Sequence, residues 1–216
     1  MTRPLAEIAC RLSRPRVLAT WIFDRLFDRV LDRRFGINSS FRASLTSLRL
    51  EAPDRAGYQP VSYLDFEVLM HAIDVNGIFV DFGSGAGRCV CLASQYPFEA
   101  VVGVELSDVL CAAARRNVIA AGVDGQIVCA DATQFSIPPR ATTFAFINPF
   151  RGRTMQSVLF NIRQSANKYP RSVTVLAYGS PVDFEFFDQF KRTEGFRMVR
   201  QVDLPTGCVA MIFENI

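Results

Sequence analysis

The sequence contains little of what a metal site or a disulfide-stapled secreted domain needs. It has one histidine, and its six cysteines form no C-x-x-C pair, so no metal site is predicted. We expect the cysteines to be buried, reduced thiols, which fits a cytoplasmic compartment. They are Cys10, Cys89, Cys91, Cys111, Cys129 and Cys208. The histidine, His71, falls in a helix predicted over residues 63–73, where we expect a packing or surface role rather than that of a base.

Long apolar runs and a strong charge imbalance are also missing. No uninterrupted apolar stretch reaches the length that spans a bilayer, and no secretory signal is recognisable. The net charge of +3 is far below that of a dedicated nucleic-acid binder, so nucleic acid is not an expected partner. With 216 residues, 50% of them hydrophobic, the chain can bury one substantial core.

The positive charge is concentrated at the start of the chain. Residues 1–55 contain 11 arginines and 6 acids, a net charge of +5, whereas the remainder carries −2. Apolar residues at helical spacing predict an amphipathic helix from Arg16 to Arg34, ended by Gly36, in which aspartates and arginines alternate as i,i+4 partners. Its role stays open among packing as a lid, dimerisation and contact with an anionic membrane surface.

A glycine motif follows the most apolar strand of the chain. Residues 78–88, IFVDFGSGAGR, predict a buried strand that runs into a tight turn and a helix. Glycines at 83, 85 and 87 leave the backbone bare for a ligand, although a tight turn alone would also explain them. A dinucleotide fingerprint would need glycine at position 88, which is Arg88. The motif instead resembles that of class I S-adenosylmethionine-dependent methyltransferases: an apolar run, an acid (here Asp81) and G-x-G-x-G.

Two further predicted strands end in an acid. Glu105 lies 18 residues beyond Gly87, a position from which a carboxylate can accept hydrogen bonds from both hydroxyls of a ribose. A surface acid at a strand end is the alternative. The resemblance also implies that Asp131, with Ala132 beside it, bonds the adenine amino group.

The fourth predicted strand, residues 143–150, ends in Asn148-Pro149-Phe150. Amine-directed members of the resembled family carry Asp/Asn-Pro-Pro-aromatic here, so this sequence lacks one proline. The likeness implies an amide oxygen, a backbone carbonyl and an aromatic wall around a nucleophilic nitrogen. The departure weakens any transfer from nucleic-acid adenine methyltransferases, and Asn-Pro is also a common turn initiator.

A tyrosine-containing loop precedes the glycine motif. With Tyr58, the F-V-D-x-G-S-G-x-G motif, G-V-E and Asn148, residues 58–150 resemble the non-SET histone lysine methyltransferases and their small bacterial relatives. The basic nucleosome-binding extensions of that family have no counterpart here, so the histone substrate is not implied. The resemblance implies S-adenosylmethionine as cofactor and Asn148, Pro149 and Phe150 as catalytic residues. The implied cofactor contacts are Tyr58, Asp81, Gly83, Ser84, Gly85, Gly87, Glu105, Leu106, Asp131, Ala132 and Asn148.

The end of the chain predicts the sheet topology. Helical and strand periods alternate after residue 150, and residues 196–203 and 208–213 flank a Pro-Thr-Gly turn as an antiparallel hairpin. We therefore expect an α/β fold: a doubly wound, Rossmann-like, seven-stranded sheet with a terminal antiparallel hairpin. Residues 1–57 are predicted as an N-terminal helical extension and residues 58–216 as the cofactor-binding domain.

The sequence therefore predicts an S-adenosylmethionine-dependent methyltransferase that acts on an amine, with a protein lysine favoured as acceptor. A small-molecule N- or O-methyltransferase is the first alternative. A nicotinamide-dependent oxidoreductase and a cofactor-binding protein without turnover are the others. The sequence predicts no oligomeric state.

Overall fold

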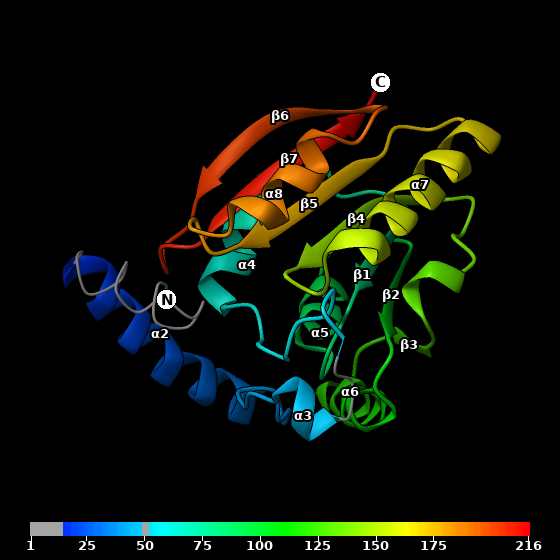
Figure 1. The fold of residues 1–216 in the computed structure, drawn as a ribbon. Coiled ribbons are helices and arrows are strands. Elements are labelled where there is room, and N and C mark those ends of the chain that lie inside the picture. The colour runs from blue at the N-terminus through cyan, green and yellow to red at the C-terminus, as the bar shows by residue number, and fades with distance from the viewer. Residues whose placement is uncertain (1–14, 49–51) are drawn as a thin grey trace.

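The computed structural model describes residues 15–48 and 52–216, which form one seven-stranded sheet flanked by helices (Figure 1). The strand order is β3-β2-β1-β4-β5-β7-β6. The strands are β1 (Ile78–Phe82), β2 (Ala100–Glu105), β3 (Gly125–Cys129), β4 (Ala141–Ile147), β5 (Thr174–Gly179), β6 (Phe196–Asp203) and β7 (Val209–Asn215). The helices are α2 (Pro15–Arg34), α3 (Leu45–Leu48), α4 (Tyr63–His71), α5 (Arg88–Ala93), α6 (Asp108–Ala121), η1 (Ala132–Gln134), α7 (Gly152–Lys168) and α8 (Phe184–Lys191).

The predicted topology is confirmed. Strands β1 to β5 pair in parallel, and β7 inserts antiparallel between β5 and β6. The strand order reverses between β1 and β4, which pair with each other at the centre of the sheet. Such a switch point leaves a crevice beyond the carboxyl ends of the strands, where open α/β sheets bind ligands.

Two apolar cores cover the two faces of the sheet. One contains residues of α7 and α8, and its rings of Phe146 and Phe190 lie 5.3 Å apart. The other contains residues of α4, α5 and α6 on the opposite face. Figure 1 shows α7 and α8 on one side of the sheet and α4 on the other, with α2 as a long outer helix.

Local capping explains where the helices begin and end. The hydroxyl of Ser62 accepts a hydrogen bond from the backbone amide of Asp65, which makes Ser62 the N-cap of α4. Gly36 has φ +71°, the left-handed conformation that ends a helix, two residues after α2. The helix predicted from Arg16 to Arg34 is therefore confirmed.

The acidic side of α2, rather than an apolar side, packs against the rest of the protein. Asp24, Asp28 and Asp32 lie four residues apart on one face and are 3–7% exposed. The first residue of α5, Arg88, is 1% exposed and forms ion pairs with Asp28 and Asp32. The prediction that these aspartates pair with arginines of their own helix is therefore wrong for Asp28 and Asp32, because the buried cation competes more strongly than a solvated one.

Neighbouring polar groups complete this buried ion-pair cluster. The Tyr63 hydroxyl donates to Asp32 at 2.9 Å, and the Ser39 backbone amide donates to the same carboxylate at 2.8 Å. The Arg88 guanidinium also donates to the carbonyl oxygen of Val61 at 2.8 Å. Because each buried charge has several partners, the cluster fixes the rotation of α2 about its own axis.

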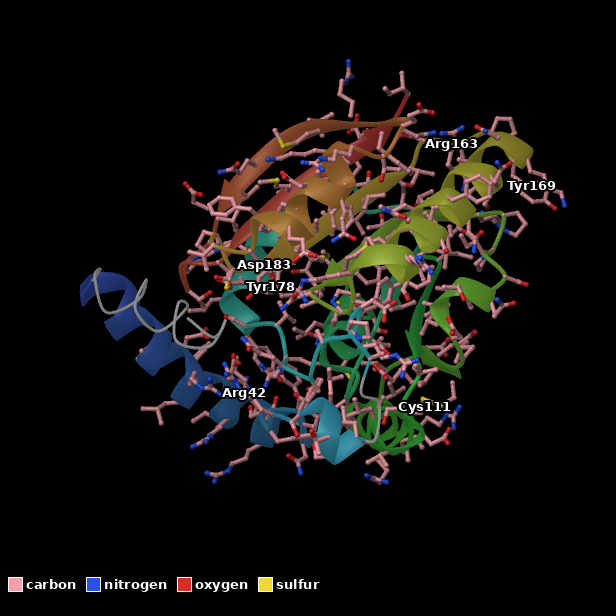
Figure 2. All side chains as sticks on the ribbon, in the orientation of Figure 1. Arg42, Cys111, Arg163, Tyr169, Tyr178 and Asp183 are labelled. Carbon is pink, nitrogen blue, oxygen red and sulfur yellow. A yellow bond between two sulfur atoms is a disulfide. The ribbon has the colours of Figure 1, made fainter. Side chains whose placement is uncertain are left out.

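The prediction that all cysteines are reduced is wrong for one pair. Cys111, in the first turns of α6, is joined by a disulfide to Cys129, the last residue of β3 (Cys111 is labelled in Figure 2). Their Cα atoms are 5.9 Å apart, within the range of disulfides, because the parallel pairing of β2 and β3 brings the two elements together. Cys89, Cys91 and Cys208 are free and buried as predicted, and Cys10 lies outside the described residues.

Asp81 is the one acid inside strand β1 and is 1% exposed. Its Oδ1 atom has no hydrogen-bond partner among the described residues. Burial, with a smaller contribution from Glu105, raises the pKa of Asp81 to about 7. The carboxyl group is therefore protonated in the folded protein at pH values where it would be ionised in the unfolded chain.

Within residues 15–48 and 52–216, no helix combines the length and the apolar character that crossing a bilayer requires. The cytoplasmic compartment stays a prediction.

We expect Arg88→Met to lower the free energy of unfolding by about 3–5 kcal/mol, because it leaves two buried carboxylates without their cation. Urea unfolding monitored by circular dichroism measures this. The control is Arg140→Met, which removes the exposed Arg140–Glu99 pair and should cost about 0–1 kcal/mol. A loss no larger than the control's would show that the cluster does not hold α2 in place.

Asp81→Asn tests the raised pKa. Since the folded pKa of about 7 exceeds the ordinary aspartate pKa of 3.8, the stability that depends on the protonated carboxyl is lost as the pH rises through that interval. The amide cannot ionise, so we expect the variant to gain up to about 4 kcal/mol near pH 8 and almost nothing near pH 4. Urea unfolding at both pH values measures the difference, with the exposed Asp74→Asn as control. Parallel pH profiles for Asp81→Asn and the parent protein would contradict the assignment.

Candidate active site

A cleft opens at the carboxyl ends of β1, β2, β3 and β4. About 770 Å³ of space, including its open mouth, lies between residues of these strand ends and residues of the segment before α4. The lining residues that the sequence predicted are Tyr58, Gly83, Gly85, Glu105, Leu106, Asp131, Ala132, Asn148, Pro149 and Phe150.

The glycine turn after β1 forms the floor of the cleft. Gly83 and Gly85 have φ values of +75° and +56°, which favour glycine. A Cβ on Gly83 would lie 2.3 Å from Pro149, and one on Gly85 would lie 2.3 Å from the Tyr58 ring. Bare backbone is therefore required here, and the turn is the point where the β4 loop and the Tyr58 loop meet.

Glu105 holds the glycine turn from the end of β2. One carboxylate oxygen accepts from the Gly85 amide at 2.9 Å, and the other accepts from the Ser107 amide at 2.8 Å. The side chain is 8% exposed and lines the cleft. A carboxylate has about four acceptor sites, so each oxygen keeps capacity for one more donor.

The far end of the cleft combines an acid with apolar walls. One Asp131 oxygen accepts from the Thr133 amide at 2.8 Å and from its hydroxyl at 2.7 Å, so Asp131 caps η1. The walls beside it are aliphatic: Leu106, Leu110, Ala130 and Ala132. This end suits a flat, weakly polar ring with a donor at its edge.

Asn148 takes an unusual backbone conformation at the end of β4. Its φ of +50° makes it the one non-glycine residue in the described part of the chain with positive φ. Asparagine tolerates this region better than most residues. Its amide oxygen accepts a hydrogen bond of 3.0 Å from the Arg151 guanidinium, which in turn forms a buried ion pair with Asp183 (labelled in Figure 2). Arg151 therefore positions the side chain of Asn148, and Asp183 holds Arg151 in place.

Pro149 and Phe150 complete the motif in different ways. The Pro149 carbonyl accepts from the Ala56 amide at 3.1 Å, which fastens the segment before α4 over the motif. Phe150 lines the cleft but is only 7% exposed, and its ring packs edge-on against Phe146 at 6.0 Å. Phe150 therefore packs mainly into the core behind the cleft, and its predicted role as an aromatic wall stays a prediction.

Three residues predicted as cofactor contacts lie behind the glycine turn instead of on the cleft wall. Asp81 is buried within β1, and Ser84 directs its hydroxyl toward Gly103, where a Cβ would lie 2.7 Å away. Gly87 packs against Ala114 of α6. A strand alternates its side chains between two faces, and the pattern of residue types alone does not tell which residues of a turn face a ligand. Their role as contacts stays a prediction.

His71 lies outside the cleft. It is exposed on α4 and its imidazole is 3.3 Å from Glu67. The predicted surface role of His71 is confirmed.

Sequence reasoning missed the cleft residues that come from the segment before α4. Leu45 and Leu48 of α3, together with Arg55, Gln59 and Thr154 of α7, also line the cleft. Irregular chain has no hydrophobic period, so apart from Tyr58 no pattern marked residues 52–59. The arginine directly after Asn-Pro-Phe was the available signal for Arg151.

These features fit S-adenosylmethionine better than a nicotinamide dinucleotide. The bare backbone at Gly83 and Gly85 matches the amino-acid tail of the cofactor. The spare acceptor capacity of Glu105 matches its ribose, and the aliphatic walls near Asp131 match its adenine. Arg88, at the position of the third dinucleotide glycine, points away into the ion-pair cluster with α2.

Comparison with protein families and solved structures agrees with this geometry. Residues 79–165 match the family model of a methyltransferase domain. No curated protein matches the sequence. Similar solved structures include an RNA methyltransferase from Salinibacter ruber in complex with S-adenosyl-L-homocysteine, with 22% identity, 73% of this chain and 94% of that chain covered, and a TM-score of 0.53.

Two other structures are similar over comparable lengths. An S-adenosylmethionine-dependent methyltransferase from Aquifex aeolicus is 14% identical, with 71% of this chain and 90% of that chain covered and a TM-score of 0.56. A ribosomal protein L11 methylase from Lactobacillus delbrueckii subsp. bulgaricus is 13% identical, with 70% and 76% covered and a TM-score of 0.54. At these identities the likeness shows the fold alone. Residues 79–165 thus match a methyltransferase domain, and the described residues share the fold of these methyltransferases.

Proposed function

We propose that the enzyme transfers the methyl group to the neutral nitrogen of an amine, with a protein lysine as the leading acceptor. The observation that carries the proposal is the placement of Asn148, which lines the cleft and whose amide oxygen is positioned by Arg151 and, through it, Asp183. An oxygen held in this way can accept from an amine N–H and aim the nitrogen lone pair at the donor.

The proposed cofactor contacts follow the order of groups along the cleft. Glu105 would bind the ribose hydroxyls, and Asp131 with Ala132 and Leu106 would bind the adenine. The backbone of Gly83 and Gly85, with Tyr58 beside it, would carry the amino-acid tail. S-adenosylmethionine supplies a methyl group on a sulfonium, so the protein's task is to position the acceptor in line, which can lower a barrier by about 7–11 kcal/mol.

The titratable groups of the cleft favour an amine over an alcohol. Burial raises the pKa of Tyr58, and its hydroxyl donates to the Ser39 carbonyl at 2.8 Å, so it does not act as a base. Both oxygens of Glu105 accept backbone hydrogen bonds. An alcohol needs a base during attack, whereas an amine that arrives neutral does not.

The apolar part of the cleft lining favours an acceptor with an aliphatic stem. Leu45, Leu48 and Pro149 are among the lining residues. A lysine places four methylenes behind its nitrogen, and such stems pack along apolar surface while the head reaches a polar group. A small aliphatic amine would meet the same walls, which keeps a small-molecule acceptor as the second candidate.

We expect Glu105→Ala to weaken the binding of S-adenosylhomocysteine at least about 100-fold, because two hydrogen bonds to a charged group are lost. Glu105→Gln, which keeps the size and one oxygen, should show an intermediate loss. Calorimetric titration measures both, and Glu99→Ala, at a half-exposed acid just before β2, is the matched control. Unchanged affinity in Glu105→Ala would remove the ribose assignment.

Asn148→Ala should suppress transfer about 100-fold or more while cofactor affinity changes little, since the residue would position the acceptor. The turnover of a lysine-containing acceptor and titration with S-adenosylhomocysteine separate the two effects. Exposed Asn76→Ala is the control. Full activity in Asn148→Ala would refute its catalytic role.

The acceptor class is tested with radiolabelled S-adenosylmethionine and cell extract, separated into macromolecular and small-molecule fractions. Label that stays in protein and appears as methyllysine after acid hydrolysis supports the leading proposal. Label in a small amine selects the second candidate, and label on oxygen contradicts the proposed chemistry.

A further inference from the structure

Helix α2 presents an apolar stripe to solvent. Phe23, Leu26 and Val30 follow each other at spacings of three and four residues and are 61%, 57% and 58% exposed. The ring of Phe27 stacks on that of Phe23 at 5.8 Å and extends the stripe. Single exposed apolar residues are ordinary on protein surfaces, but an aligned set on one helix marks an interaction site.

The stripe cannot rotate into the protein, because the opposite face of α2 is fixed. Asp28 and Asp32 are held by Arg88, and the Ser62 hydroxyl donates to Asp24. Turning the apolar side inward would leave the buried Arg88 without its counter-charges, which costs several kcal/mol. The ion-pair cluster therefore sets the outward direction of the stripe.

The charge around the stripe has one sign. All three acids of α2 lie on the buried face, whereas Arg29, Arg33 and Arg34 are exposed. Among residues 15–48 and 52–216, none of these three arginines forms an ion pair. In Figure 2 nitrogen-tipped side chains project from α2 away from the sheet. The outward side of the helix is thus apolar and cationic.

We propose that this side of α2 docks the enzyme on an anionic lipid bilayer. An apolar stripe with adjacent arginines is the pattern of helices that lie in the membrane interface. A second copy of the chain fits less well, because a symmetric pairing of two α2 helices would place arginines against arginines. Nucleic acid would satisfy the arginines but has no apolar surface for Phe23, Leu26 and Val30.

Docking through α2 would hold the cleft close to the membrane. Eleven residues after α2 the chain forms α3, whose leucines line the cleft, and Figure 1 shows α3 directly beyond the end of α2. The inference does not depend on which acceptor the enzyme methylates.

The full chain is tested with phosphatidylcholine vesicles made with and without phosphatidylglycerol. We expect flotation with the anionic vesicles only, weakened by salt.

Variants separate the two components of binding. The triple change F23S/L26S/V30S should weaken vesicle binding at least about tenfold. R29A/R33A should weaken it about 25-fold at low salt, at about fivefold for each arginine. The control I119S/F160S removes two exposed apolar residues on α6 and α7 and should bind as the parent protein does. All variants should keep the parent's affinity for S-adenosylhomocysteine, which confirms that they fold.

Four outcomes would overturn the proposal. They are absence of vesicle binding, equal binding to neutral vesicles, variants that bind like the parent protein, and a dimer in sedimentation that F23S/L26S/V30S dissolves. The last result would identify a second copy as the occupant of the stripe.

Discussion

A single buried cation organises the part of the molecule that precedes the sheet. Arg88 begins the helix that follows the glycine turn, and its guanidinium is surrounded by carboxylates of α2 and by a carbonyl of the loop before α4. One residue thus links the cofactor turn to the outer helix. A buried arginine with these partners is tolerated only when every partner is in place, so the positions of α2, the loop and α5 are set together.

The cleft also depends on the position of the chain between α2 and α4. Its floor is made by the glycine turn and Glu105, which follow β1 and end β2. Part of its wall comes from Leu45, Leu48 and residues 55–59, which lie between α2 and α4 in the chain. The backbone hydrogen bond from Ala56 to Pro149 closes that wall over the Asn148 motif. A cleft built from two distant segments can position both a cofactor and an acceptor, because each segment supplies a different side.

Sequence patterns predicted the features that a few consecutive residues encode. They did not predict contacts between residues far apart in the sequence. The strand–glycine–helix unit, the acids at the ends of β2 and β3 and the terminal hairpin are each written in a few consecutive residues, and the structure contains them all. The pairing of Asp28 with Arg88 joins residues 60 apart, so the helical period of α2 alone could not reveal it. The inward direction of Asp81 and Ser84 and the meeting of Cys111 with Cys129 likewise follow from how the elements pack, which no single segment encodes.

The sequence separation within the ion-pair cluster also bears on the order in which the chain folds. During synthesis α2 leaves the ribosome well before Arg88 exists, and its three aspartates remain hydrated until the cation arrives. Closing so long a loop carries an entropic penalty that is repaid only when the cluster forms. A nascent chain interrupted before residue 88 would present α2 with its hydrogen bonds to Ser62 and Tyr63 but without the cation that its carboxylates surround.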